Sequence, residues 1–124
     1  MPTFSKSSAE KLSTCDKRLQ DLFAEVVKIQ DCTVTCGFRG EKEQNDAYAN
    51  GFSRQKFPNG KHNILPSLAV DVVPYPIDYS NIERLKAFAL LVKDVADKMG
   101  IDVEAGADWT DFTDYPHYQV KPNA

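Results

Sequence analysis

The stretch LAVDVVP, residues 68–74, decides the fold of this chain. It is apolar, rich in valine and closed by Pro74 and Pro76, a pattern that predicts a buried strand. Asp71 stands in the middle of this run, where an unpaired carboxylate would be costly. We therefore expect a cationic partner, either a Lys or Arg side chain or a metal ion. Taken alone, Asp71 favours a structural salt bridge.

The segments on either side of this strand mix helices and strands without regular βαβ alternation. Helices are expected at 8–29, 41–51 and 82–99, and further strands at 32–36, 101–106 and 117–120. Two apparent capping boxes, Ser7 with Glu10 and Ser80 with Glu83, precede the two longer helices. The stretch 52–67 is long for a loop in a compact domain, and such loops are often functional. We predict an α+β fold, with helices packed on a small, mostly antiparallel sheet in a single domain spanning 1–124.

The composition excludes several classes of protein. The net charge of −3 and the absence of a basic cluster argue against a nucleic-acid partner. No run of 18 apolar residues is present, so membrane insertion is not expected. The N-terminal segment lacks the apolar core of a signal peptide, which predicts cytoplasmic synthesis. The odd number of cysteines argues against a disulfide framework.

The cysteines are expected to be buried free thiols. Cys32 and Cys36 also have the spacing of a C-x3-C metal pair. Strand alternation would put these two on one face, and buried thiols are the favoured interpretation for them and for Cys15.

The chain has two histidines, His62 in the long loop and His117 at the start of the last strand. One histidine near a required aspartate is most often only hydrogen-bonded. Together with Asp71, however, the two make a three-ligand set suited to catalytic zinc, which keeps a fourth position for water.

Two further residues could take part in chemistry. Asp114 precedes His117 by three residues and could act as a general base, although alone it favours a turn aspartate. Arg39 lies between a predicted strand and a predicted helix. It could clamp a substrate carboxylate or be an ordinary surface arginine.

Three segments together resemble a known family of zinc peptidases that cut peptidoglycan stem peptides. They are GFRGEKEQNDAYANGFS (37–53), GKHNILPSLAVDVVPYP (60–76) and GADWTDFTDYPHYQV (106–120). The family includes D-alanyl-D-alanine peptidases and, more similar to this chain, the L-alanyl-D-glutamate endopeptidases that serve as bacteriophage endolysins. The resemblance runs over about residues 34–120.

The resemblance implies roles for particular residues. One zinc ion per chain would be held by His62, Asp71 and His117, with Asp114 as the general base. Arg39 would bind substrate carboxylate and help to polarise the scissile carbonyl, with Gln44 at its partner position. Candidates for the walls of the substrate groove, with core packing as the alternative, are Tyr75, Trp109, Tyr115 and Tyr118.

The first histidine motif departs from the family's common form in two ways. Gly60 stands where serine is usual, and eight residues instead of six separate His62 from Asp71. Ala69 and Asp71 keep their places, so we expect zinc binding to survive. The departures affect the shape of the pocket and therefore the choice of substrate.

The implied function is a monomeric L-alanyl-D-glutamate endopeptidase that reaches the cell wall after a holin opens the membrane. A D-alanyl-D-alanine carboxypeptidase or dipeptidase would use the same metal ligands. A non-catalytic cell-wall-binding or virion domain would keep a relic zinc site. In a metal-free interaction domain, Asp71 would instead pair with a lysine or an arginine.

Overall fold

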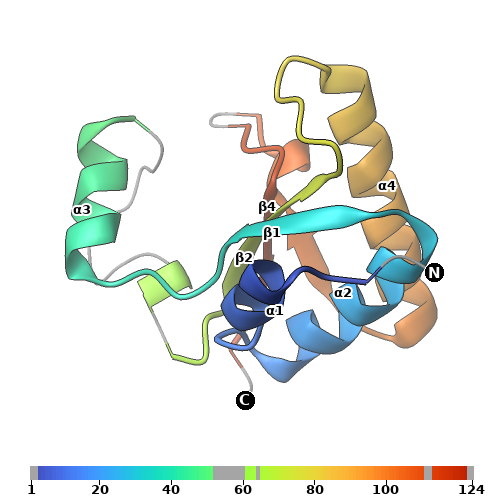
Figure 1. The fold of residues 1–124 in the computed structure, drawn as a ribbon, viewed down its shortest axis with the longest axis horizontal. Helices are drawn as coiled ribbons and strands as arrows, with labels where there is room; N and C mark the ends of the chain where they lie inside the picture. The colour runs from blue at the N-terminus through green and yellow to red at the C-terminus, as the bar shows by residue number, and fades with distance from the viewer. Residues whose placement is uncertain (1–2, 52–60, 64, 111–112, 123–124) are drawn as a thin grey trace.

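The computed structural model describes residues 3–51, 61–63, 65–110 and 113–122 and has an antiparallel sheet at its centre (Figure 1). The strands are β1 (Cys32–Cys36), β2 (Ala69–Pro74), β3 (Val103–Ala105) and β4 (His117–Val120). Their order is β1-β2-β4-β3, and every neighbouring pair is antiparallel. The predicted α+β class is therefore confirmed, and the stretch 68–74 provides an inner strand of the sheet.

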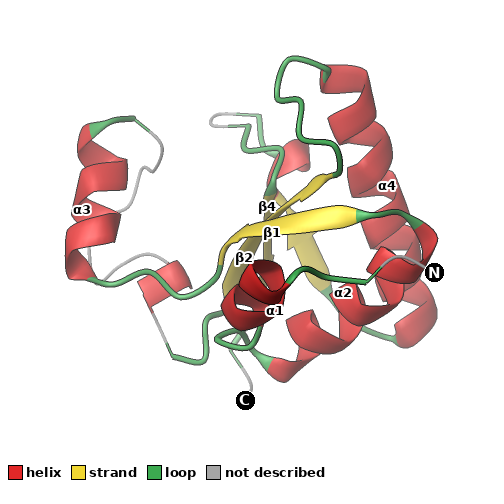
Figure 2. Cartoon of the chain, viewed as in Figure 1, coloured by secondary structure: helices red, strands yellow, loops and turns green. Residues whose placement is uncertain are grey.

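One face of the sheet packs against α2 (Lys17–Ile29) and α4 (Ile82–Met99), as Figure 2 shows. Val70 and Val72 of β2 are buried against these helices. Tyr118 of β4 is fully buried, and its ring lies 5.4 Å from that of Phe23 in an edge-to-face contact. Because side chains alternate along a strand, the neighbours of these residues point to the other face. Asp71 and His117 therefore share the face that does not carry the main core.

The helix predicted over 8–29 is wrong in one respect, because the structure divides it into α1 (Lys6–Leu12) and α2. The apolar residues keep their helical period through the break between α1 and α2. The backbone at the break, however, forms hydrogen bonds with a distant residue. Ser67 donates its backbone N–H to Thr14 and accepts that of Asp16, each at 2.8 Å. Asp16 then caps α2, since its Oδ1 accepts the N–H of Arg18.

Both predicted capping boxes are also wrong. The N-cap of α1 is Ser5, whose hydroxyl accepts the N–H of Ser8. The N-cap of α4 is Asn81, whose Oδ1 accepts the N–H of Arg84, while Ser80 bonds to Asp78. Each actual cap lies within two residues of the predicted one, since several polar residues precede each helix. The end of α4 at Gly100, with φ of 72°, is as predicted.

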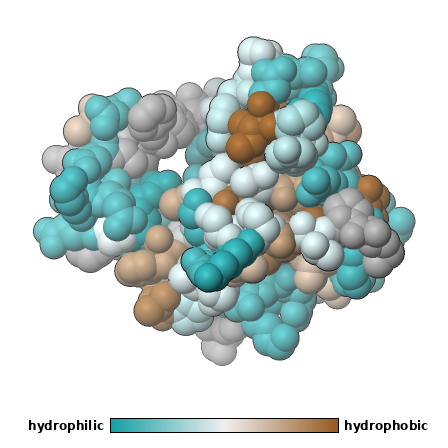
Figure 3. All heavy atoms as spheres, in the orientation of Figure 1, coloured by the Kyte–Doolittle hydropathy of each residue, from teal (hydrophilic) through white to brown (hydrophobic). Residues whose placement is uncertain are grey.

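The remaining helices are α3 (Glu41–Ala49), η1 (Lys61–Asn63) and η2 (Gly106–Asp108). In the space-filling view of Figure 3, α3 stands out from the body of the molecule with a largely hydrophilic surface. Of the predicted loop at 52–67, residues 52–60 and 64 lie outside the described part of the chain.

Candidate metal centre

Three elements bring His62, Asp71 and His117 together on the face opposite the main core. His62 comes from η1, Asp71 from β2 and His117 from the first position of β4. Asp71 and His117 are directly paired across the two strands. The candidate ligand atoms of the three residues all lie within 4.8 Å of one another. Residues 9 and 46 positions apart in the sequence thus meet at one point.

The donor atoms of this cluster have the arrangement of metal ligands. His62 Nε2 lies 3.4 Å and His117 Nδ1 3.5 Å from Asp71 Oδ1. Bonds of about 2.0–2.1 Å at tetrahedral angles would separate neighbouring ligand atoms by roughly 3.4 Å. Among the described residues, His62 Nε2 and Asp71 Oδ1 are buried without a hydrogen-bond partner. Buried polar atoms are rarely left so, and a shared cation would satisfy both.

His62 is held by the backbone of the segment that follows β1. Its Nδ1 donates to the carbonyl of Gly37 at 2.8 Å, which leaves Nε2 directed at Asp71. A Cβ atom at Gly37 would lie 2.2 Å from the carbonyl oxygen of Lys11. Glycine is therefore needed for this segment to pass against the end of α1 and reach His62.

His117 is held in the opposite tautomer. Its Nδ1 faces Asp71, and its Nε2 donates to Oε1 of Gln119 at 2.7 Å. The ring of Trp109 lies 4.9 Å from the ring of His117. The two histidines would thus bind a metal ion through different nitrogens, His62 through Nε2 and His117 through Nδ1.

The charges of the cluster are strongly coupled. Burial opposes protonation of His62, but its contacts with Asp71 and Cys36 outweigh this and raise the pKa of His62 to about 10. Burial acts to raise the pKa of Asp71, but its contacts with His117 and His62 hold that pKa far below its usual range. The site therefore keeps a carboxylate at neutral pH, and a metal ion must displace a proton from His62.

Asp114 lies beside the cluster at the start of the tight turn that leads to His117. The backbone N–H of His117 donates to the carbonyl of Asp114, which places Asp114 Oδ2 3.8 Å from His117 Nδ1. Burial and the charge of Asp71 raise the pKa of Asp114. A Cβ atom at Gly106 would lie 2.2 Å from the carbonyl oxygen of Asp114, so this turn also depends on a glycine.

Arg39 reaches the cluster from the other side. Its Nη2 lies 3.5 Å from Asp71 Oδ2, so the salt bridge expected for Asp71 and the histidine cluster are both present. Nη1 donates to Oε1 of the buried Gln44 at 3.0 Å. The backbone N–H of Arg39 donates to the carbonyl of His62, and Asn63 donates its side-chain amide to the carbonyl of Arg39. These bonds join the segment just before α3 to η1, which carries His62.

The aromatic residues proposed as groove walls lie in different places. The ring of Trp109 contacts that of His117 at a tilt of 44°, and Tyr115 is half-buried in the turn between Asp114 and His117. Tyr75 is 56% exposed and lies beyond the end of β2, about 13 Å along the strand from Asp71 by the usual rise per residue. Tyr118 packs in the core.

The prediction that Cys32 and Cys36 share a face of the strand is wrong. The pairing of β1 with β2 shifts between Val34 and Cys36, so that Cys36 is opposite Asp71. This bulge turns Cys36 toward the histidine cluster while Cys32 stays in the core. Cys36 Sγ lies 3.5 Å from Arg39 Nη2 and 3.9 Å from His62 Nδ1. All three cysteines are free, as predicted, but Cys36 is only half-buried.

Sequence reasoning missed several residues around the cluster, namely Cys36, Asn63, Glu104 and Gln119. A signal existed for Gln119, since it follows His117 by two positions on one face of a strand. No comparable signal marks Glu104, which meets Gln119 only through the pairing of β3 with β4.

Nearly the whole length of the chain matches a known family. The model of the phage L-alanyl-D-glutamate peptidases matches residues 2–121. The chain belongs to this family. The description of this family agrees with the resemblance that the histidine, aspartate and arginine motifs indicated from the sequence.

Two relatives extend this comparison. The peptidoglycan L-alanyl-D-glutamate endopeptidase CwlK of Bacillus subtilis (strain 168) is 30% identical over 108 residues, which cover 75% of this chain and 62% of CwlK. The chain thus spans less than two thirds of CwlK. The crystal structure of the L-Ala D-Glu endopeptidase ChiX of Serratia marcescens superposes with a TM-score of 0.80. It is 24% identical, covers 97% of this chain and 91% of its own, and shows that the fold is shared.

Among the described helices of this family member, none has the length and apolar character needed to span a bilayer.

Proposed function

We propose that this chain is a zinc-dependent peptidase that hydrolyses the L-alanyl-D-glutamate bond of peptidoglycan stem peptides. The observation that carries the proposal is the buried cluster of His62, Asp71 and His117, in which His62 Nε2 and Asp71 Oδ1 lack a hydrogen-bond partner among the described residues. Three such ligands, with nitrogen and carboxylate donors, suit a catalytic zinc ion that keeps a position open. We expect one zinc ion per chain.

A zinc ion at this site would act as a Lewis acid on the scissile carbonyl and make a water molecule more acidic. Asp114 would accept the proton of that water, since its Oδ2 lies 3.8 Å from His117 Nδ1 and its pKa is raised. The protonated Asp114 would then return the proton to the leaving amine. These two transfers make Asp114 the general base and afterwards the general acid.

Arg39 would bind the negatively charged parts of the substrate. Its guanidinium carries five N–H donors, of which the contacts with Asp71 and Gln44 occupy only some. Gln44 and Asn63 hold its side chain and its backbone, so the group is positioned before substrate arrives. Arg39 therefore supports both substrate carboxylate binding and stabilisation of the developing oxyanion.

Product analysis tests the proposed bond. Purified sacculi are digested with the zinc-loaded protein, and the released muropeptides are identified by mass spectrometry. We expect glycan-linked fragments that end in L-alanine and soluble peptides that begin with D-glutamate. Release of D-alanine would instead establish a D-alanyl-D-alanine carboxypeptidase or dipeptidase. Zinc binding without any product would establish a non-catalytic wall-binding or virion domain.

The biological role that fits this activity is that of a phage endolysin. The description of the matching family names phages, and the relative CwlK is named for the same bond. We propose that the chain acts as a monomer on the cell wall after a holin opens the membrane. Lysis of host cells that express the chain with and without a holin tests this role.

A further inference from the structure

A closed circuit of side-chain contacts is formed by His117, Gln119, Glu104 and Trp109. It lies on the side of His117 that faces away from Asp71. His117 Nε2 donates to Gln119 Oε1 at 2.7 Å, and Gln119 Nε2 donates to Glu104 Oε2 at 3.3 Å. Glu104 Oε2 also accepts the indole N–H of Trp109 at 2.7 Å. The Trp109 ring closes the circuit, because it lies 4.9 Å from the ring of His117.

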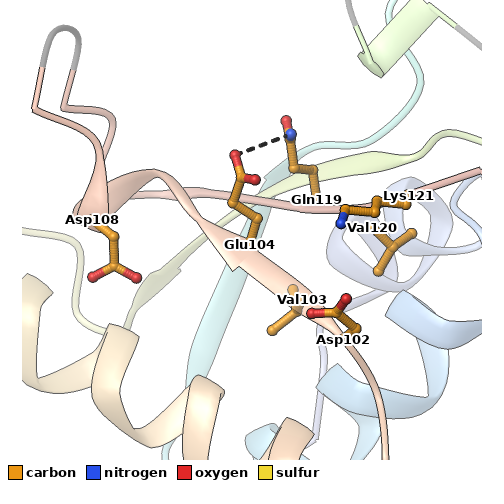
Figure 4. A pocket seen from close by; sticks show the side chains of 7 residues that line it. All are labelled: Asp102, Val103, Glu104, Asp108, Gln119, Val120 and Lys121. Carbon is orange, nitrogen blue, oxygen red and sulfur yellow. Dashed lines mark hydrogen bonds between the residues drawn. The ribbon is translucent and has the colours of Figure 1, made fainter.

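The sheet itself builds this circuit. His117 and Gln119 are two residues apart on β4, so their side chains share one face. Glu104 of β3 is paired directly opposite Gln119. Figure 4 shows the Glu104 and Gln119 side chains meeting over these strands, at a pocket of about 240 Å³ that also includes Asp102 and Asp108. The backbone register therefore fixes which residues meet.

The direction of each hydrogen bond follows from the charge of Glu104. A carboxylate only accepts hydrogen bonds, so the Gln119 amide must turn its NH₂ group toward Glu104. Its carbonyl oxygen then faces His117 and demands a proton on Nε2. A histidine protonated at Nε2 has its lone pair on Nδ1, the atom that faces Asp71.

We infer that Gln119 and Glu104 are positioning residues that hold His117 in its metal-binding tautomer and so set the metal affinity of the site. The inference rests on the metal site of the proposed function. Outer partners of histidine ligands commonly fix the ring in this way. Here the partner of His117 is an amide whose direction is set by a second residue, whereas His62 relies on the Gly37 carbonyl.

Three variants separate this role from a general structural one. Gln119→Leu removes the acceptor of the His117 N–H, and Glu104→Leu removes the acceptor that orients the Gln119 amide, so that this amide can turn either way. The exchange Glu104→Gln/Gln119→Glu restores a defined direction, since the new carboxylate at position 119 accepts from His117 directly. Asp102→Asn is the matched control, because it removes one charge from the same pocket but leaves the circuit intact.

The zinc dissociation constant, measured by competition with a chromophoric chelator, is the first readout. We expect Gln119→Leu to weaken binding about 10- to 100-fold, and Glu104→Leu to fall near the lower end of that range. The exchange should recover to within about threefold of the parent, because the two positions compensate each other. Asp102→Asn should bind as the parent does.

The tautomer of His117 is the second readout, and it needs no activity. Long-range ¹H–¹⁵N spectra of the metal-free protein, recorded where His117 is neutral, report which ring nitrogen carries the proton. We expect Nε2–H in the parent and in the exchange variant, and a shift toward Nδ1–H in Glu104→Leu. With only two histidines, the signals can be assigned directly.

The outcomes are distinct when melting curves show that each variant is folded. Single variants with parental zinc affinity and parental tautomer would overturn the inference but not the proposed function. An exchange variant as weak as Gln119→Leu would also overturn it. A parent protein that binds no zinc would overturn both.

Discussion

Asp71 shows how much one carboxylate can organise when it is placed in an apolar strand. Its two oxygens face His62, His117 and Arg39, three groups from three different segments. The side chain is only 16% exposed, so these partners compensate for its removal from water. The residue that looks misplaced in LAVDVVP is therefore the one around which the site is arranged.

Asp114 can be tested without disturbing the metal ligands. Asp114→Asn keeps the shape of the side chain but removes its ability to accept a proton, so hydrolysis of sacculi should fall about 10²- to 10⁴-fold. Zinc content, measured by atomic absorption, should stay near one ion per chain. Asp108→Asn, which changes an exposed aspartate paired with Lys93, is the control and should remain active. A fully active Asp114→Asn variant would assign the base to another residue.

Tyr118 leads to a prediction of increased stability. Its hydroxyl is buried and lacks a hydrogen-bond partner among the described residues, while its ring packs against Phe23. Because an unsatisfied buried hydroxyl is unfavourable, Tyr118→Phe should raise the free energy of unfolding by about 1 kcal/mol. Denaturant unfolding of the metal-free protein measures this. Tyr118→Leu should lower stability, and a loss in Tyr118→Phe would show that the hydroxyl is bonded.

At the level of elements, the sequence predicts those helices and strands that depend on residue type and on the spacing of apolar residues nearby in the chain. The inner strand at 68–74, the helix that ends at Gly100 and the antiparallel sheet follow from such local patterns. The break between α1 and α2 does not, because Ser67 stabilises it from a distant part of the chain. The turn of Cys36 toward the site is equally hidden, since regular alternation gives no sign of a bulge.

The same distinction holds for the site. Two histidines and a misplaced aspartate were recognisable as residue types, and the structure brings them together. Glu104 was not recognisable, because its relation to His117 depends on the register of two strand pairs. Local patterns thus indicate the ligands, while the residues that orient them require the tertiary structure.

The crossing of α1 and the segment after β1 can be tested through Gly37. Gly37→Ala would put a Cβ atom 2.2 Å from the Lys11 carbonyl oxygen, so the segment that holds His62 must move. We expect a loss of about 2–4 kcal/mol in unfolding free energy, the range of severe steric changes, together with weaker zinc binding. Gly40→Ala is the control, since the nearest atom would be Glu43 Oε1 at 3.6 Å. Equal stability of the two variants would contradict the close approach.

At the scale of the whole molecule, the candidate metal site joins parts that the fold otherwise connects weakly. His62 belongs to a segment beside α3, while Asp71 and His117 belong to the central sheet. A bound ion would stabilise the folded state because the unfolded chain does not hold these three residues together. Metal binding and folding should therefore be linked.

This linkage should depend on pH in a defined direction. In the metal-free protein, the raised pKa of His62 gives stability that is fully present below its ordinary value of 6.5 and is lost as the pH rises toward about 10. Zinc competes with that same proton, so its stabilising effect should grow over this range. Melting temperatures with zinc and with EDTA, measured from pH 6.5 to 9, should diverge as the pH rises. A constant or shrinking difference would contradict the assignment of His62 as a ligand.

The unequal supports of the two histidines have a consequence for the evolution of the site. The partner of His62 is a main-chain carbonyl, which a substitution can displace but cannot delete. The partner of His117 is the side chain of Gln119, which a single codon change can replace. Inherited differences in metal affinity among descendants of this chain should therefore accumulate on the β3–β4 side, where natural selection can tune the site without losing it.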